Sequence, residues 1–128
     1  MPKAVQFSIG LDNTAGTLAD LCRLLKKNKI NIEAISVSDN TDCGWVRVVA
    51  TPSAKARAVL AKAKYLVAAQ LVMTVQADNR PGELERIAAR LAKVGVNINY
   101  IYGSTSGDRP STMVLGVSDV EKALEALE

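Results

Sequence analysis

The chain contains no histidine, only two cysteines, and few aromatic residues, which make up 4% of its 128 residues. Without histidine, zinc sites and histidine-dependent acid–base or nucleophilic mechanisms lose their usual residue. Cys22 falls in a helical apolar pattern and Cys43 in a predicted turn, so we expect both to be structural. No spacing pairs a nucleophile with a base. We therefore expect no catalytic residue, no metal, no cofactor and no enzyme activity.

The chain also lacks a long apolar run. The longest, residues 65–77, is interrupted by Gln70 and Gln76 and is too short to cross a bilayer. The first residues lead directly into an alternating strand pattern, which leaves no room for a signal peptide. A composition of 48% hydrophobic and 23% charged residues is typical of a soluble globular protein. We expect a cytoplasmic protein without membrane contact.

A short polar motif is present twice. Residues 78–84 read Asp-Asn-Arg-Pro-Gly-Glu-Leu, and residues 12–18, 66 positions earlier, read Asp-Asn-Thr-Ala-Gly-Thr-Leu. Each copy follows an apolar run and opens a stretch with helical apolar spacing. The motif therefore predicts a strand that enters a helix through a glycine-containing turn, used twice.

The repeat extends beyond the motif. Both predicted helices end at Asn-Ile, residues 31–32 and 97–98, and each is followed by a strand, a polar turn, a further strand and a second helix. Ser53 and Ser118 are predicted to cap the second helices, the latter in a capping box with Glu121.

This order predicts an α+β protein of two tandem ferredoxin-like βαββαβ units, each an antiparallel sheet with its helices on one face. We place the domains at residues 1–70 and 71–128. In the first domain residues 65–67 supply a fourth strand before a new strand begins at Leu71, whereas the second domain lacks its last strand. We expect the open edge to be covered by the first domain or by another copy of the chain.

The turn has the chemistry to hold a zwitterion. A helix N-terminus presents unpaired backbone N–H groups that suit a carboxylate, and an aspartate suits an ammonium group. Glycine lets a ligand approach the backbone closely. An alternative is purely structural, because Asp and Asn before a helix, and Pro and Glu in its first turn, are ordinary helix-start residues.

Residues 78–84, with the helix and strand that follow through Tyr102, closely resemble the first half of an ACT domain. Residues 4–68 resemble the family more weakly, with Thr14-Ala15 where it prefers Arg-Pro. The resemblance implies a βαββαβ module that binds an amino acid at the interface of paired units. The ligand would be held by the strand-to-helix turn of one unit and the strand after the first helix of its neighbour.

Carried over to this sequence, the resemblance implies two sets of ligand-binding residues. The first set is Asp12, Asn13, Gly16, Thr17, Leu18, Asn31 and Ile32. The second is Asp78, Asn79, Arg80, Gly82, Glu83, Leu84, Asn97 and Ile98. Leu18 and Leu84 could instead belong to the core.

The leading hypothesis is thus an allosteric regulatory protein of amino-acid metabolism. It would bind a free amino acid and act through ligand-dependent oligomerisation, as a homodimer, or through an enzyme or regulator partner. The alternative is a structural or adaptor module that binds a protein partner and no ligand. Nucleic-acid binding is a third possibility, because Tyr100 and Tyr102 alternate on a predicted strand, but the aromatic RNP motif is missing and interface packing is favoured.

Overall fold

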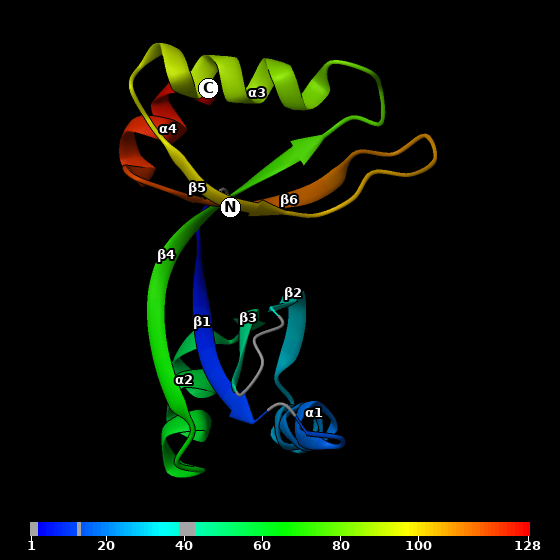
Figure 1. The fold of residues 1–128 in the computed structure, drawn as a ribbon, viewed down its shortest axis with the longest axis vertical. Helices are drawn as coiled ribbons and strands as arrows, with labels where there is room; N and C mark the ends of the chain where they lie inside the picture. The colour runs from blue at the N-terminus through cyan, green and yellow to red at the C-terminus, as the bar shows by residue number, and fades with distance from the viewer. Residues whose placement is uncertain (1–2, 13, 39–42) are drawn as a thin grey trace. The chain divides into compact units, whose positions relative to one another are not determined.

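The computed structural model describes residues 3–12, 14–38 and 43–128. Its described residues form six strands and four helices in two compact units (Figure 1). The N-terminal unit comprises Val5–Gln70, and the C-terminal unit comprises Leu71–Glu128 together with Lys3 and Ala4. The predicted fold class, α+β with two tandem ferredoxin-like units, is confirmed.

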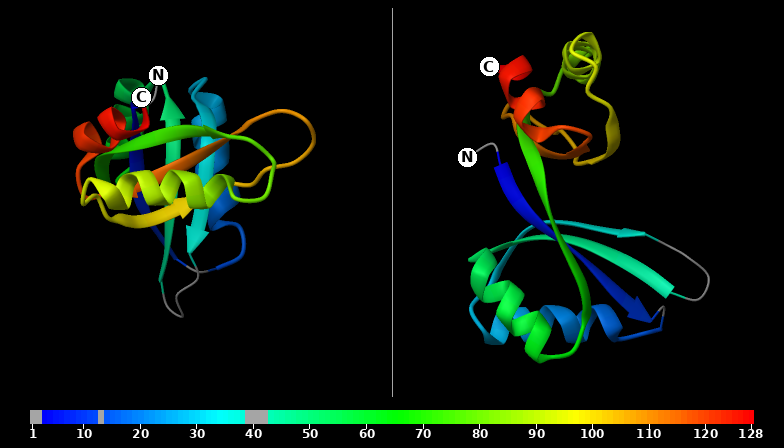
Figure 2. Two further views of the ribbon diagram at one scale, coloured as in Figure 1. Left: turned by 90° about the horizontal axis from the view of Figure 1, so that it is seen from above. Right: turned by 90° about the vertical axis from the view of Figure 1, so that its left-hand side faces the viewer.

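The N-terminal unit has two helices on one face of an antiparallel sheet, as Figure 2 shows. Its strand order is β2-β3-β1-β4, the order expected of a ferredoxin-like unit. In sequence its elements are β1 (Lys3–Asp12), α1 (Thr17–Lys27), β2 (Asn31–Ser38), β3 (Cys43–Thr51), α2 (Ser53–Lys62) and the beginning of β4 (Leu66–Ala77).

The C-terminal unit repeats the plan. The rest of β4 pairs with β6, and β6 pairs with β5, both antiparallel. Its further elements are α3 (Glu83–Lys93), β5 (Ile98–Tyr102), β6 (Ser111–Val117) and α4 (Val120–Leu127). The other neighbour of β4 in the strand order is β1, whose first residues belong to this unit, and the ammonium of Lys3 forms an ion pair with the Glu121 carboxylate on α4. The start of β1 therefore occupies the side of β4 where a fourth strand is missing.

One strand replaces two that the sequence suggested. Residues 65–67 and the run from Leu71 were predicted as separate strands, but β4 runs without a break from Leu66 to Ala77. No glycine or proline lies between them, so nothing in the local chain favours a turn there.

The repeat is visible in backbone detail. The pairing of β2 with β3 shifts register between Ile32 and Ala34, and that of β5 with β6 shifts between Ile98 and Tyr100. The irregularity follows the Asn-Ile dipeptide in both units. Tyr100 then lies over Gly116, where an added Cβ would be 2.2 Å from its ring, so packing explains both residues.

Each unit has its own hydrophobic core between sheet and helices. The N-terminal core is built on Phe7, Ile9, Leu21, Leu25, Ile30, Val46, Val48 and Leu60. The C-terminal core is built on Met73, Ala77, Ile87, Leu91, Val96, Leu115 and Ala123. The first helix of each unit thus contributes two large residues one turn apart, Leu21 and Leu25 or Ile87 and Leu91.

The predicted caps of the second helices are wrong. Helix α2 has Pro52 at its N-cap position, and α4 has Asp119, whose carboxylate accepts the backbone N–H of Lys122 at 3.0 Å. Ser118 lies one residue too early, and its hydroxyl instead accepts the backbone N–H of Asn97 at 2.9 Å. A capping box with Glu121 therefore does not form.

Candidate functional site

The turn between β4 and α3 has a compact, defined backbone. The N–H of Arg80 donates to the carbonyl of Asp78 at 3.0 Å, and the N–H of Arg86 donates to the carbonyl of Gly82 at 2.9 Å. Gly82 occupies the N-cap position with a φ of +85° and provides no side-chain cap. The structural alternative, in which Asp78 or Asn79 caps this helix, is not the geometry found.

Glu83 is the buried charge of this turn, with 5% of its surface exposed. One carboxylate oxygen accepts the backbone N–H of Asp78 at 2.8 Å, and the other accepts Nε of Arg86 at 2.9 Å. The hydrogen bond from Arg86, followed by that from the Asp78 backbone, lowers the pKa of Glu83 from 4.5 to about 2, against the opposing effect of burial. Glu83 therefore ties the strand end to the first turn of α3.

Asn79 fastens the turn to the hairpin between β5 and β6. Its amide nitrogen donates to the carbonyl of Gly107 at 3.2 Å, and its amide oxygen accepts the hydroxyl of Thr105 at 3.0 Å. Both ends of the side chain are therefore engaged within the chain. The structure thus gives Asn79 and Glu83 roles in shaping the site.

A cavity of about 310 Å³ opens between the turn and this hairpin. It is lined by Ala77, Asp78, Arg80, Glu83, Leu84, Ile87, Gly103, Ser104, Thr105 and Met113. The side chains of Arg80 and Asp78 are 60% and 51% exposed, and Nη2 of Arg80 is 3.8 Å from Oδ2 of Asp78. Because that contact is long for a charge-assisted hydrogen bond, both groups retain capacity for a ligand. We call this space the turn cavity.

The hairpin residues of the turn cavity were missed by sequence reasoning. Gly103, Ser104, Thr105 and Met113 line the cavity although none was a candidate. Thr105 was predicted to begin a polar hairpin turn, and the other three to lie in the strands beside it, but no local signal in a single sequence places that hairpin against another turn.

The first copy of the motif folds alike but borders a different cavity. The N–H of Thr14 donates to the carbonyl of Asp12 at 2.9 Å, and Gly16 has a φ of +93° at the N-cap of α1. The hydroxyl of Thr17 lies 2.8 Å from the carbonyl oxygen of Asp12, so it closes the turn from within. Asn13 lies outside the described residues.

The cavity beside this first turn measures about 250 Å³. Asp12 and Thr17 line it from the motif, and Asp20, Lys64 and Tyr65 are further lining residues. This cavity is therefore also lined by carboxylates and a cation. The first motif has Thr14 where the second has Arg80, and the cation here is Lys64, which follows α2.

The two leucines of the motif are not core residues. Leu18 is 38% exposed and Leu84 is 51% exposed, and Leu84 also lines the turn cavity. The motif glycines also face open space, since a Cβ built on Gly16 or Gly82 meets no atom within 4 Å. Their positive φ accounts for glycine at both positions.

The Asn-Ile dipeptides lie elsewhere in each unit. Asn31 and Ile32 line a separate groove with Cys22, Lys26 and Lys29 at the end of α1.

The second dipeptide is likewise engaged away from the turn cavity. The side chain of Asn97 donates to that of Asn99 at 2.8 Å, and Ile98 packs against the C-terminal core. An 11-residue helix, about 16 Å long, separates Asn97 from the turn cavity of its own unit. The structure therefore does not bring these four residues to the motif turn of the same unit.

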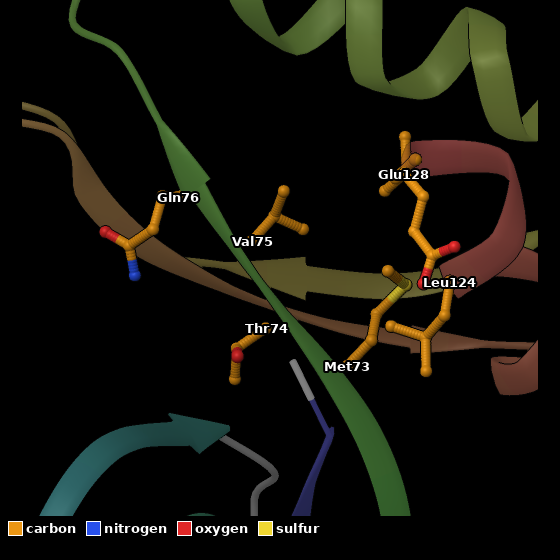
Figure 3. Close-up of a pocket in the computed structure, with 7 residues that line it drawn as sticks. Met73, Thr74, Val75, Gln76, Leu124 and Glu128 are labelled. Atoms are coloured by element: carbon orange, nitrogen blue, oxygen red, sulfur yellow. The ribbon is translucent and has the colours of Figure 1, made fainter. Parts of the chain in front are cut away.

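Figure 3 shows another cavity of the C-terminal unit, of about 340 Å³, between β4 and the end of α4. Met73 and Leu124 approach each other, whereas Gln76 points away from them. Glu128 is the one charged residue among those that line it. None of the described residues that line it is a cation, and the nearby Arg90 already donates to an oxygen of Glu128 at 3.2 Å, so this cavity suits a zwitterion less well than the turn cavity does.

Two further observations concern the described residues only. None of their helices is long and apolar enough to cross a membrane. Within the same ranges, no three acidic, cysteine or histidine side chains gather in a group that could hold a metal ion.

Comparisons with known proteins agree on the architecture. A family model described as an ACT domain pair matches residues 3–127. Among solved structures, protein BT0572 from Bacteroides thetaiotaomicron is 30% identical with a TM-score of 0.90, over 98% of this chain and 86% of that one. No curated protein matches the sequence.

More distant solved structures share the fold. The ligand-free regulatory subunit of aspartate kinase from Thermus thermophilus is 14% identical with a TM-score of 0.71, over 98% of this chain and 90% of that one. The corresponding subunit from Thermus flavus is 18% identical with a TM-score of 0.64, over 99% and 91%. At these identities the likeness concerns the fold alone.

Proposed function

The chain belongs to the family of ACT domain pairs, and we propose that it is a regulatory protein that binds a free amino acid. The observation that carries the proposal is the turn cavity, where Arg80 and Asp78 place opposite charges beside an apolar wall. A free amino acid carries the same two charges on neighbouring groups.

We assign Arg80 to the ligand carboxylate and Asp78 to its ammonium group. The guanidinium of Arg80 has five N–H donors, and its ion pairs with the described residues are long, 3.5 Å to Glu83 and 3.8 Å to Asp78, so donors remain for a ligand. Glu83 suits the ammonium group less well than Asp78, because it is 5% exposed and its oxygens already accept hydrogen bonds from the Asp78 backbone and Arg86. In this proposal Glu83 and Asn79 hold the turn and hairpin in place.

The first turn is proposed as a second and different site. Asp12 there corresponds to Asp78, and Lys64 is the cation that lines the same cavity. A lysine is a point charge without the planar fork of arginine, so we expect weaker and less selective recognition of a carboxylate there.

Regulation would follow from assembly. Asn31, Ile32, Asn97 and Ile98 do not reach the turn of their own unit, so we propose that they contact the ligand only when supplied by a second copy of the chain. A ligand that contacts two copies binds the dimer more tightly than the monomer, and this difference in affinity stabilises the dimer. Aspartate kinase regulatory subunits are among the proteins of like fold, and this supports a separate enzyme or regulator as the partner that is controlled.

An adaptor role without a ligand is the second candidate. It is favoured by Ile35 and Val37, which are exposed although their cross-strand partners, Val48 and Val46, lie in the N-terminal core. Exposed apolar side chains on a strand at the end of the sheet order suit a protein partner.

Thermal-shift screening against the twenty amino acids separates the two candidates. A ligand that binds the folded state raises its melting temperature by mass action. We expect a shift with the wild-type protein that Arg80→Gln and Asp78→Asn abolish and that Asp12→Asn alters less. No shift with any amino acid at millimolar concentration would refute ligand binding and favour the adaptor role.

A further inference from the structure

The turn cavity combines two exposed charged groups with buried apolar surface. Arg80 and Asp78 are exposed, whereas Ile87 and Ala77 are buried and Met113 is half-buried. The buried Glu83 also lines the cavity, but its oxygens accept hydrogen bonds from Arg86 and the Asp78 backbone, and Ser104 and Thr105 are polar but uncharged lining residues. A ligand that places its zwitterion on Arg80 and Asp78 therefore directs its side chain toward lining residues that carry no unpaired charge and are in part apolar.

We propose that the ligand of the turn cavity is an amino acid with an uncharged aliphatic side chain, and that Leu84 and Met113 are specificity-determining residues. This inference rests on the proposed function, since it names the ligand class of the same site.

The charges around the turn cavity balance. Asp78 and Glu83 are the anions that line the cavity, Arg80 is the cation, and Arg86 pairs with Glu83 from α3. The set sums to zero, and a zwitterion leaves it at zero. A lysine or aspartate ligand adds a charge for which no unpaired counter-charge lines the cavity, and a buried uncompensated charge is strongly disfavoured.

The size and shape of the turn cavity suit a small ligand. A cavity of about 310 Å³ is at the small end of ligand sites, which span roughly 300–1,000 Å³. Met113 bounds it from β6, with its sulfur so close to Gly103 that an added Cβ there would lie 2.6 Å away. Gly103 therefore lets Met113 lie against the hairpin and leave room for a short side chain.

Leu84 offers the ligand an exposed apolar side chain. This side chain is 51% exposed, yet it lines the cavity from the first turn of α3. An aliphatic ligand that packs against it removes apolar surface of both partners from water, at roughly 25 cal/mol per Å².

Titration calorimetry on the full chain tests the ligand class with L-valine, L-leucine, L-isoleucine, L-alanine, L-lysine and L-aspartate. We expect one of the branched amino acids to bind at least about tenfold more tightly than alanine, and lysine and aspartate to bind more weakly still. Tightest binding of lysine or aspartate would overturn this inference and leave the proposed function standing. Absence of binding with these six, together with no thermal shift for any of the twenty amino acids, would overturn the proposed function as well.

Variants of two exposed leucines test the specificity residue. Leu84→Lys adds a positive charge at the cavity, so we expect the Kd of the branched ligand to rise about fivefold or more and that of aspartate to fall. Leu71→Lys is the matched control, because Leu71 is 45% exposed and lines none of the cavities described above. Both variants should keep the wild-type melting temperature to within a few degrees. An unchanged ligand preference in Leu84→Lys, or the same change in Leu71→Lys, would contradict the assignment.

Discussion

Replacing Gly82 by alanine measures what the motif glycine contributes. Gly82 has a φ of +85°, and a Cβ added there meets no atom within 4 Å, so the cost is confined to the backbone. A left-handed conformation costs an L-residue about 1–2 kcal/mol. The reduced freedom of alanine in the unfolded chain offsets about 0.4–1 kcal/mol of that cost. We therefore expect Gly82→Ala to lower the free energy of unfolding by about 1 kcal/mol.

Urea unfolding followed by circular dichroism checks this value. Gly95→Ala is the matched control, because Gly95 has a φ of +75° with equally empty surroundings but lies at the other end of α3. Both alanine variants should lose a similar amount, and Gly82→Asn should lose less, since asparagine tolerates this conformation. A loss above about 3 kcal/mol, or none, would refute the reasoning. Lost ligand binding with unchanged stability would instead assign Gly82 to close approach of the ligand.

Three further outcomes follow from the same contacts. Because the pKa of Glu83 falls from 4.5 to about 2 on folding, its contribution to stability is complete above pH 4.5 and is lost as the pH falls toward 2. In thermal unfolding at a series of pH values, Glu83→Gln should therefore lose less of its melting temperature at acid pH than the wild type does. The same pH profile in both proteins would contradict this role of Glu83. Leu91→Ala removes a fully buried side chain and should cost about 2–5 kcal/mol by calorimetry, whereas a cost under 1 kcal/mol would mean that the C-terminal core is packed differently. Asn79→Ala removes two hydrogen bonds to the β5–β6 hairpin and should speed amide hydrogen exchange at residues 103–110, with no change elsewhere in the C-terminal unit.

Local patterns were sufficient for much of the fold. Helix spacing located α1 and α3 because a buried stripe at Leu21 and Leu25, or Ile87 and Leu91, is a local signature. The duplicated motif predicted two turns, and both have the same backbone hydrogen bonds and a glycine with positive φ. These features depend on residues that are close in the sequence, so they can be predicted from one sequence alone.

Features that depend on distant partners were not predictable. The paired register shifts after Ile32 and Ile98 arise from strand pairing. The open edge of the second unit was expected to be covered by the first domain or by another copy of the chain, but nothing local identified the start of β1 as the segment beside β4. Ser118 resembled a cap, but its hydroxyl binds the backbone of Asn97, 21 positions away in the chain. Helix-capping preferences predict which residue types occur at a helix start, but they do not predict which group each side chain hydrogen-bonds.

The candidate site shows the same division. Asp78 and Arg80 were predicted as ligand contacts, and both line the turn cavity with only a long contact, 3.8 Å, between their charged groups. Asn79 and Glu83 were predicted as ligand contacts, but their hydrogen-bonding groups are engaged by the hairpin, Arg86 and the backbone of Asp78. Hydrophobic spacing placed Leu84 on the same helical face as Ile87, yet it is exposed because the cavity leaves it uncovered.

The most direct test of the account locates the ligand by NMR. The full chain, labelled with ¹⁵N, is titrated with L-isoleucine, and amide shifts are followed residue by residue. We expect the largest shifts to fall on residues 78–84 and 103–105, and to disappear in Arg80→Gln. Shifts confined to residues 73–76, or none at millimolar isoleucine, would contradict the assignment of an aliphatic amino acid to the turn cavity.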